Sequence, residues 1–390
     1  MGFLRLFLFL AVVFACKTYM LAQNSEENIL YERSSLHSMM IGHKNQKFSE
    51  IVEQVFKSVP FPERFNDHNL GVKSVDFAET SSDLSSHVDL FCKKVNLGQK
   101  MVAKWFNRNK STGTFDMELV KERGFYNASQ ADIKLARASL RGEALLKDAG
   151  ENLISSTYLL MNDVTYQSKG TSGSFLKMMA NVYSFSPKKL QENMQAIGGF
   201  KVQIRSYLFK LVWNDSIANE FYRKYYTEQE DKEKSQLFMN EKELFSMEYI
   251  GCTTSESSEQ HFSKSKEPAV LLTKVLTRAI DQNIAQLQHD HEPFRIKAPL
   301  ISTEPLQAYI GLKEDVSTSR QYEVLERVQN EDGSISYERI GIIKPVAGRI
   351  WDNRYMSYED EGVDKEVKAT EFEKVSGKDF YTGMLIREIK

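Results

Sequence analysis

Two histidines and two acids follow one another in the segment His289-Asp290-His291-Glu292. Imidazole and carboxylate groups are metal ligands, but the spacing that places two histidines one helical turn apart in HExxH sites is missing. The segment follows an expected helix and precedes Pro293. Histidine interacts favourably with the carbonyl end of a helix, so this position explains the segment without a metal. We therefore expect neither a metal site nor a cofactor site, and the metal reading stays as the alternative.

Two glycine-containing segments resemble catalytic or ion-binding loops only superficially. The segment Gly170-Thr-Ser-Gly173 matches neither a phosphate-binding loop nor a nucleophile elbow. The segment Asn330-Glu-Asp-Gly333 lacks the ligand positions of a calcium loop, and Asp-Gly favours a tight hairpin turn. No short motif specifies a reaction, so we assign no catalytic residue.

An aromatic and basic cluster is the strongest candidate for a binding site. It consists of Arg349, Trp351, Arg354 and Tyr355. Tryptophan, tyrosine and arginine dominate binding hot spots, so we predict that this cluster contacts a partner, either an envelope protein or a glycan such as peptidoglycan. Ordinary packing in the wall of a domain is the alternative.

Composition and charge exclude several classes of protein. Of 390 residues, 41% are hydrophobic and 27% are charged, which is typical of globular proteins. The formal net charge is −2, so no overall basic field would hold nucleic acid. We expect a folded protein that does not bind nucleic acid.

The N-terminus resembles an export signal. Arg5 precedes ten apolar residues, 6–15, which suit a signal-peptide core and are too short to span a bilayer. Cleavage after Ala22 or before Cys16 would fit, and lipidation of Cys16 is the less favoured option. No later segment has 18 consecutive apolar residues, so the mature chain should lack a transmembrane helix. We expect an exported protein in the periplasm or at the outer membrane, with residues 1–22 as the signal peptide.

After removal of that segment, Cys92 and Cys252 remain. Cysteines in an oxidising compartment can pair, although sequence alone does not supply the geometry of a disulfide. Two buried free thiols are the favoured reading, and a single disulfide remains the alternative.

Hydrophobic periodicity predicts an α+β fold whose first folded part is an α/β domain over residues 49–298. Residues 23–48 are polar and read as a flexible leader, and the Gly- and Ser-rich residues 167–186 read as an exposed insertion. Apolar residues alternate in 200–213 but change phase midway, which predicts a β-bulge or bend near Ser206. In Pro268–Gln288 the apolar residues recur at intervals of three and four, which predicts a helix with one buried face.

The C-terminal segment, 299–390, has a different pattern. Short alternating runs are separated by turns, and no helical periodicity remains. Five or six short strands within 90 residues predict a small β-barrel or sandwich.

Several segments resemble known families. Met101–Asn107, Leu119–Ser129, Phe209–Asn214 and Leu276–Asp281 resemble a family of uncharacterised secreted proteins from Bacteroidetes-type bacteria. That resemblance implies export and carries no catalytic residue.

The C-terminal part is similar to the small β-barrel of envelope-assembly proteins such as the flagellar protein FlgT. The similarity rests on Ala308–Asp315, Tyr322–Val324, Ile340–Lys344 and Gly383–Arg387. A glycine normally follows the acidic residue in this pattern, whereas Val316 follows Asp315 here. The resemblance implies that the preceding domain is similar to the curli-secretion or TolB amino-terminal kind.

These observations favour a non-enzymatic protein of the cell envelope that binds or assembles other envelope components. A secreted hydrolase would need a nucleophile–base pair or a metal, which distant residues could still assemble. A surface adhesin that binds glycan or protein is the third hypothesis.

Overall fold

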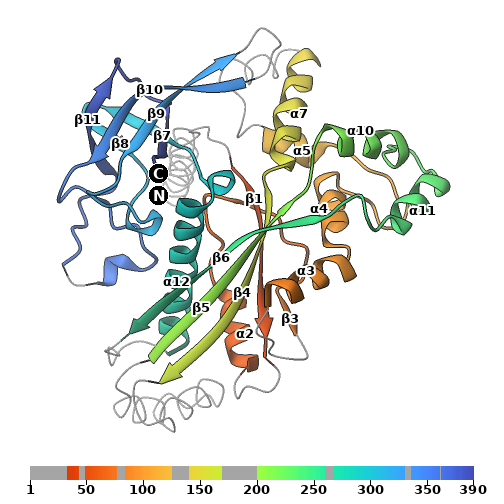
Figure 1. The fold of residues 1–390 in the computed structure, drawn as a ribbon, viewed down its shortest axis with the longest axis horizontal. Helices are drawn as coiled ribbons and strands as arrows, with labels where there is room; N and C mark the ends of the chain where they lie inside the picture. The colour runs from red at the N-terminus through yellow and green to blue at the C-terminus, as the bar shows by residue number, and fades with distance from the viewer. Residues whose placement is uncertain are drawn as a thin grey trace, which may run out of the picture.

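The computed structural model describes residues 33–43, 49–76, 84–124, 140–168, 200–259, 268–329, 335–360 and 362–390. The predicted signal peptide and nearly all of the predicted insertion lie outside these ranges. The fold is α+β, with a mixed sheet and its helices followed by a closed β-barrel (Figure 1).

The first module is built on a six-stranded sheet with the order β2-β1-β4-β5-β6, and β3 also pairs with β1. Strand β1 runs parallel to β2, β3 and β4, whereas β4, β5 and β6 pair antiparallel. The strands are β1 (Ser35–Gly42), β2 (Asn66–Asp67), β3 (Ser74–Asp76), β4 (Thr157–Ser168), β5 (Phe200–Leu211) and β6 (Met247–Glu259).

The leader prediction is wrong for residues 35–42, which form β1 in the interior of the sheet. Every residue of β1 except Ser38 is buried, and the strand pairs with β4 from Ser35 to Ile41. The strand is buried on both faces and carries Ser and His among its apolar residues, so it lacks the alternation that marks a half-buried strand.

The β-bulge or bend predicted near Ser206 is found only in the pairing with β6, two residues further along. Strand β5 pairs with β4 in unbroken register through Ser206, and the register shift with β6 lies between Leu208 and Phe209. Ser206 is buried and donates to Asn162 Oδ1 at 2.7 Å. The apolar phase changes because Val202 and Ile204 pack on one side of the sheet, whereas Tyr207 and Phe209 pack on the other.

Helices cover both faces of this sheet. One face packs on α2 (Ser49–Ser58) and α12 (Pro268–Asp290). The other face packs on a larger cluster that is rich in aromatic rings around Phe106 and Phe221. The helices contributing to that cluster are α3 (Leu84–Lys94), α4 (Leu97–Trp105), α5 (Glu118–Gly124), α7 (Leu140–Ile154), α10 (Asp215–Lys224) and α11 (Lys232–Asn240).

Helix α12 confirms the stripe expected from the sequence. Leu272, Leu276, Ile280, Ile284 and Leu287 are all buried in the cluster between α12 and the sheet. Its opposite side faces the second module, so α12 lies between the two parts of the molecule (Figure 1).

The second module is a closed barrel with the strand order β10-β11-β8-β7-β12-β9, with β9 and β10 completing the ring. Its core contains Leu300, Val324, Ile343 and Ile386. The barrel strands are β7 (Ala298–Thr303), β8 (Leu306–Ala308), β9 (Tyr322–Gln329), β10 (Ile335–Pro345), β11 (Thr370–Gly377) and β12 (Leu385–Glu388). Three short 3₁₀ helices accompany them: η1 (Glu292–Phe294), η2 (Leu312–Glu314) and η3 (Ser357–Glu359).

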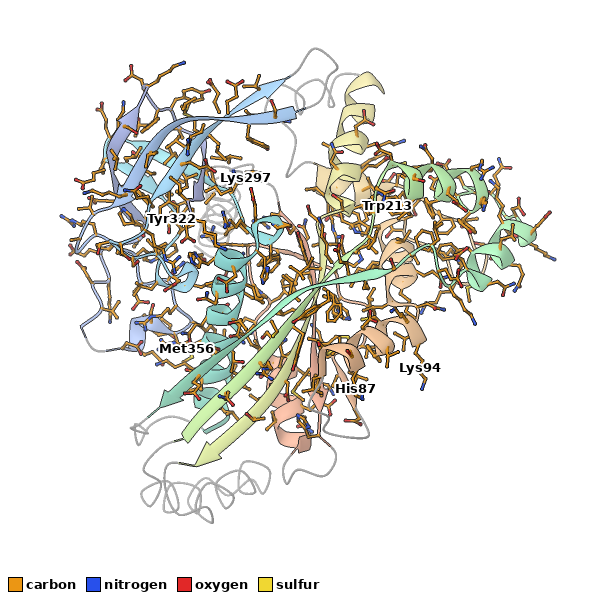
Figure 2. The ribbon with its side chains drawn as sticks, in the orientation of Figure 1. His87, Lys94, Trp213, Lys297, Tyr322 and Met356 are labelled. Carbon is orange, nitrogen blue, oxygen red and sulfur yellow. The ribbon has the colours of Figure 1, made fainter. Side chains whose placement is uncertain are left out.

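Figure 2 shows labelled residues on both sides of α12. Tyr322 and Met356 lie on the barrel side of α12, whereas Trp213 lies on the other side, beside α10.

The predicted Asp-Gly hairpin turn at 331–333 falls outside the described residues, and the strands that flank it pair antiparallel from Gln329 and Ile335.

Candidate binding surface and the charged junction beside it

The loop before β11 and the loop after β8 together present an aromatic pair, in which Tyr309 is exposed and Trp351 is half-buried. The rings of Tyr309 and Trp351 meet edge to face, with centroids 6.1 Å apart. Tyr309 is 41% exposed and Leu312 is 38% exposed. Arg349, also on the outside of the barrel, lies 3.9 Å from Glu371 in a solvent-accessible ion pair. We call Tyr309, Leu312, Arg349 and Trp351 the barrel platform.

Backbone pairing holds the barrel platform in one shape. Gly311 and Trp351 form an isolated bridge, and the amide of Leu312 donates to the Trp351 carbonyl at 2.9 Å. A Cβ atom on Gly311 would lie 2.1 Å from that carbonyl oxygen, so only glycine allows this approach. The Trp351 amide donates to Thr370 Oγ1 at 3.0 Å. The aromatic pair is therefore preorganised, which lowers the entropic cost of binding a partner.

The sequence-based cluster divides into two groups in the structure. Arg349 and Trp351 belong to the barrel platform, whereas Arg354 pairs within its own loop and Tyr355 contacts α12. Arg354 donates to both carboxylate oxygens of Asp352, at 2.9 and 2.6 Å, and the Tyr355 carbonyl accepts from Arg278 at 2.9 Å. Tyr355 thus joins the loop to α12, while Arg354 braces the loop from within, which gives both residues a structural role beside any contact with a partner.

Asp360 is the centre of that attachment. Its two oxygens accept from Lys274 and Arg278 of α12, each at 2.7 Å. Burial by itself would raise the pKa of Asp360, but these hydrogen bonds outweigh it and hold the pKa below its ordinary value. Lys274 is almost fully buried, so its ammonium depends on this carboxylate.

A second attachment connects the loop before β2 with the barrel. Arg64 Nε donates to Glu314 Oε1 at 2.7 Å. The other oxygen of Glu314 accepts from the Gly311 amide at 2.8 Å and from Asn353 Nδ2 at 2.7 Å. One carboxylate thus fixes both the base of the barrel platform and the contact between modules.

Asp281 of α12 lies beside this attachment with little compensation. Its nearest cation is Lys313 Nζ at 3.8 Å, and its Oδ2 atom has no hydrogen-bond partner among the described residues. Burial raises the pKa of Asp281 to about 7, and Lys313 offsets only part of that effect. A carboxyl group that titrates near neutrality can exchange protons under ordinary conditions.

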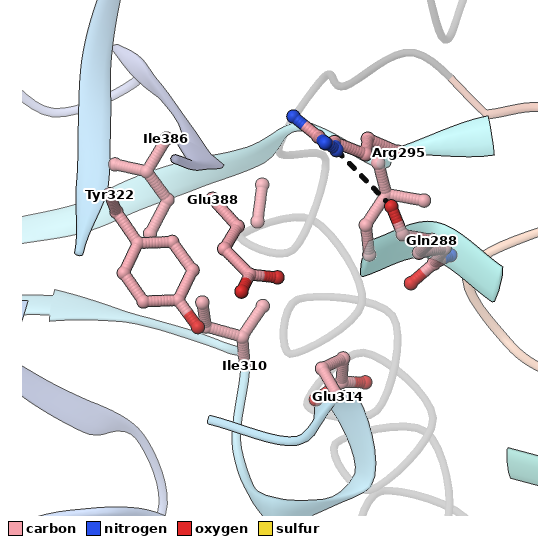
Figure 3. Close-up of a pocket in the computed structure, with 9 residues that line it drawn as sticks. Gln288, Arg295, Ile310, Glu314, Tyr322, Ile386 and Glu388 are labelled. Atoms are coloured by element: carbon pink, nitrogen blue, oxygen red, sulfur yellow. Dashed lines mark hydrogen bonds between the residues drawn. The ribbon is translucent and has the colours of Figure 1, made fainter. Parts of the chain in front are cut away.

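Three small cavities follow the junction between α12 and its neighbours, and Asp281 lines two of them. The third lies between the end of α12 and the barrel, where the side chains of Tyr322, Glu388 and Glu314 converge (Figure 3). Burial raises the pKa of the Tyr322 hydroxyl, so that group stays protonated. Two of the cavities have mixed polar and apolar walls, and the one lined by Phe65, Ile284 and Ala285 is mainly apolar. Each has room for only a few water molecules.

The two histidines of the 289–292 segment contact different parts of the molecule. His289 Nδ1 is 3.0 Å from Glu388 Oε1 and 2.8 Å from Arg320, at the end of α12. His291 packs against Gly251 of β6, where a Cβ atom would lie 2.3 Å from its Nε2. Within the described ranges, no three His, Cys, Asp or Glu side chains are grouped to hold a metal ion.

Sequence reasoning missed a histidine–aspartate pair at the end of the parallel strands. His43, after β1, has Nε2 2.6 Å from Asp163 Oδ1 of β4, and this hydrogen bond raises the pKa of His43. A nucleophilic site would add a thiol or hydroxyl to this pair. The exposed thiol, Cys252, lies on β6, three strands away, a separation of roughly 14 Å at the usual strand spacing. The pair could have been found only from the strand register.

Two buried histidines, His37 and His68, lie on the face of the sheet that packs on the aromatic-rich cluster. His68 is 2.8 Å from Arg123, which also covers the ring of Trp105 at 4.4 Å. His37 is fully buried, and neither of its ring nitrogens has a hydrogen-bond partner among the described residues. Burial, with the nearby Lys73 and Lys104, lowers the pKa of His37 to about 3. Both rings are neutral parts of the core.

Both described cysteines are free thiols. Cys92 is buried, in agreement with the favoured sequence reading, whereas Cys252 is exposed. No helix of the described chain is long and apolar enough to cross a membrane. Comparison of the sequence with family models and with curated proteins finds no match to either.

Proposed function

We propose that this protein is a non-enzymatic, exported component of the cell envelope that binds other envelope components through the barrel platform. The observation that carries the proposal is the pair of exposed Tyr309 and half-buried Trp351, which is held in place by the Gly311–Trp351 bridge. Aromatic side chains with a neighbouring arginine provide large contact energies in protein interfaces. The export signal read from residues 1–22 supports the compartment.

The arrangement of the two modules supports an assembly role. Asp360 and Glu314 tie the barrel to the helical side of the sheet at two separate places. A force or a displacement at the barrel platform would therefore be transmitted to α12 and the sheet. This rigidity suits a component that holds two partners in a defined orientation.

The test uses substitutions in the barrel platform. A photo-crosslinker introduced at Leu312 should trap an envelope protein in living cells, and Trp351→Ala should reduce the trapped fraction at least about tenfold, as for an interface hot spot. Tyr381→Ala is the matched control, because Tyr381 is an exposed aromatic residue on a different loop of the barrel. Sedimentation with purified peptidoglycan would detect a glycan partner.

Capture that is equal in the wild type and Trp351→Ala would reject the barrel platform. Turnover of an ester, peptide or glycoside by the purified protein, lost on His43→Gln, would favour the hydrolase instead.

A further inference from the structure

Strand β6 forms one edge of the six-stranded sheet. It pairs with β5 along its length and with no other strand of the described ranges. Figure 1 shows it on the side of the sheet away from β1. An edge strand presents a row of backbone N–H and C=O groups that can pair with another chain.

The sequence of β6 lacks lysine and proline, two of the residues that most often protect an edge. Its thirteen residues, MEYIGCTTSESSE, contain no lysine, arginine or proline. The irregularity in its pairing lies near Gly251, and from Cys252 to Glu259 the strand stays in regular register with β5. Helix α12 covers one face of the strand, where Ser255 Oγ donates to the Ala279 carbonyl at 2.7 Å. Helix α12 thus covers one face of β6, whereas the edge of the strand from Cys252 to Glu259 keeps the geometry that strand pairing requires.

The charge of β6 indicates what kind of strand would fit. It contains three glutamates and no base, and Glu248 and Glu256 are exposed. Strand β5, its existing neighbour, shows the complementary pattern. Lys210 lies opposite Glu248, and Gln203 donates to Glu256 at 2.9 Å. A second neighbour would meet the same acidic side chains from the other side.

We propose that the β6 edge binds an extended, basic segment of a partner protein by strand addition. Backbone hydrogen bonds would supply most of the affinity, and the glutamates would favour lysine or arginine at the positions opposite them. A second copy of this chain fits less well, because antiparallel pairing of two β6 strands brings only acids to the new interface. The proposal concerns a different module from the barrel platform, so either can fail without the other.

The probe is a twelve-residue peptide that repeats the sequence of β5, FKVQIRSYLFKL, which carries three basic residues. Its control has glutamate at those three positions. We expect the basic peptide to bind the full-length protein in fluorescence anisotropy and the acidic peptide to bind at least about tenfold more weakly. Hydrogen exchange should then show added protection at alternate amides of β6 between Cys252 and Glu259, which is the signature of strand pairing.

Two further variants locate the charge contribution on β6, and methylated peptides separate strand addition from simple charge attraction. Glu248→Gln with Glu256→Gln should weaken binding roughly three- to tenfold, whereas Glu233→Gln, an exposed acid on α11, should leave it unchanged. Peptides methylated on alternate backbone nitrogens should lose binding in one of the two possible phases only.

Several results would overturn the proposal. These are no binding of the basic peptide, equal loss of binding in both methylated phases, and added protection outside β6. Concentration-dependent self-association that protects β6 without any peptide would assign the edge to a second copy instead.

Discussion

Arg64 and Glu314 connect the two modules across 250 positions of sequence, with Nε and Oε1 2.7 Å apart. Their side chains are only 16% and 11% exposed. Because both side chains are shielded from solvent, removing one of them leaves the other charge buried and unpaired. That change strongly destabilises the folded protein.

Removing the carboxylate of Glu314 should loosen the junction and the barrel platform together. Glu314→Ala leaves Arg64, the Gly311 amide and Asn353 without their shared acceptor, so we expect a loss of about 3 kcal/mol in the free energy of unfolding. Urea denaturation measures it. Lys93→Ala, which breaks an exposed pair with Asp89 on α3, should change stability by less than about 1 kcal/mol. Equal effects of the two substitutions would contradict the assigned role.

Asp360 should be as important on the other side of α12. Asp360→Asn removes the charge that compensates Lys274 and Arg278, and we expect a loss of about 3 kcal/mol. The matched control is Asp379→Asn, since Asp379 is fully exposed and lies 3.8 Å from Lys374. Thermal unfolding would follow both variants, and an unchanged melting temperature in Asp360→Asn would contradict the prediction.

Asp281 should make the protein less stable as the pH rises. Its pKa is about 7 in the folded protein and 3.8 ordinarily, so the folded state binds the proton more tightly than the unfolded chain. Stability from this group is therefore complete below about pH 4 and is lost as the pH rises to about 7, by at most about 1.4 kcal/mol per pH unit.

Asp281→Asn imitates the protonated form, so it should raise the melting temperature at pH 8 and flatten the pH dependence between pH 4 and 7. His43 contributes in the same direction, since its raised pKa stabilises the fold below about pH 6.5 and that stability is lost at higher pH. His43→Gln measured in parallel separates the two groups. An Asp281→Asn protein with the wild-type pH slope would show that this carboxyl does not titrate in that range.

His37 should make the protein less stable as the pH falls, which is the opposite of the effect of Asp281. Its pKa falls from 6.5 to about 3 on folding, so the unfolded chain takes up a proton that the folded protein rejects. Stability is lost as the pH falls below about 6.5. His37→Leu, of similar size and without unpaired nitrogens, should be more stable than the wild type at pH 5.5. A lower melting temperature for His37→Leu at that pH would indicate a required polar role.

The two cysteines should differ in reactivity. Burial raises the pKa of Cys92 to about 12, whereas Cys252 is exposed on β6. In a Cys16→Ser background, a maleimide should modify one thiol per native molecule and two after denaturation, as counted by intact mass. The thiolate is the reactive form, so a raised pKa protects Cys92 as well as its burial does. Rapid modification of Cys92 in the native protein would show that the helix opens.

Local periodicity was sufficient for some elements. The spacing of Leu272, Leu276 and Ile280 determines one face of α12, because residues three and four apart lie side by side on any helix. The short alternating runs after residue 300 likewise predicted the strands of the barrel. Strand β5 shows the limit of this reasoning, since burial of both faces produced the change of phase that a bulge would also produce.

The sequence by itself determined the α+β class, the α12 stripe and the strand-rich C-terminal module, because these depend on the order of neighbouring residues. Only the tertiary structure decided that the Tyr355 carbonyl binds Arg278 of α12 while Trp351 packs against Tyr309, although Tyr355 and Trp351 lie four positions apart. It alone placed Arg64 against Glu314 and left Asp281 buried with an unpaired oxygen. Hydrogen bonds and burial depend on which distant segments meet, and that information is not contained in the spacing of residues along one element.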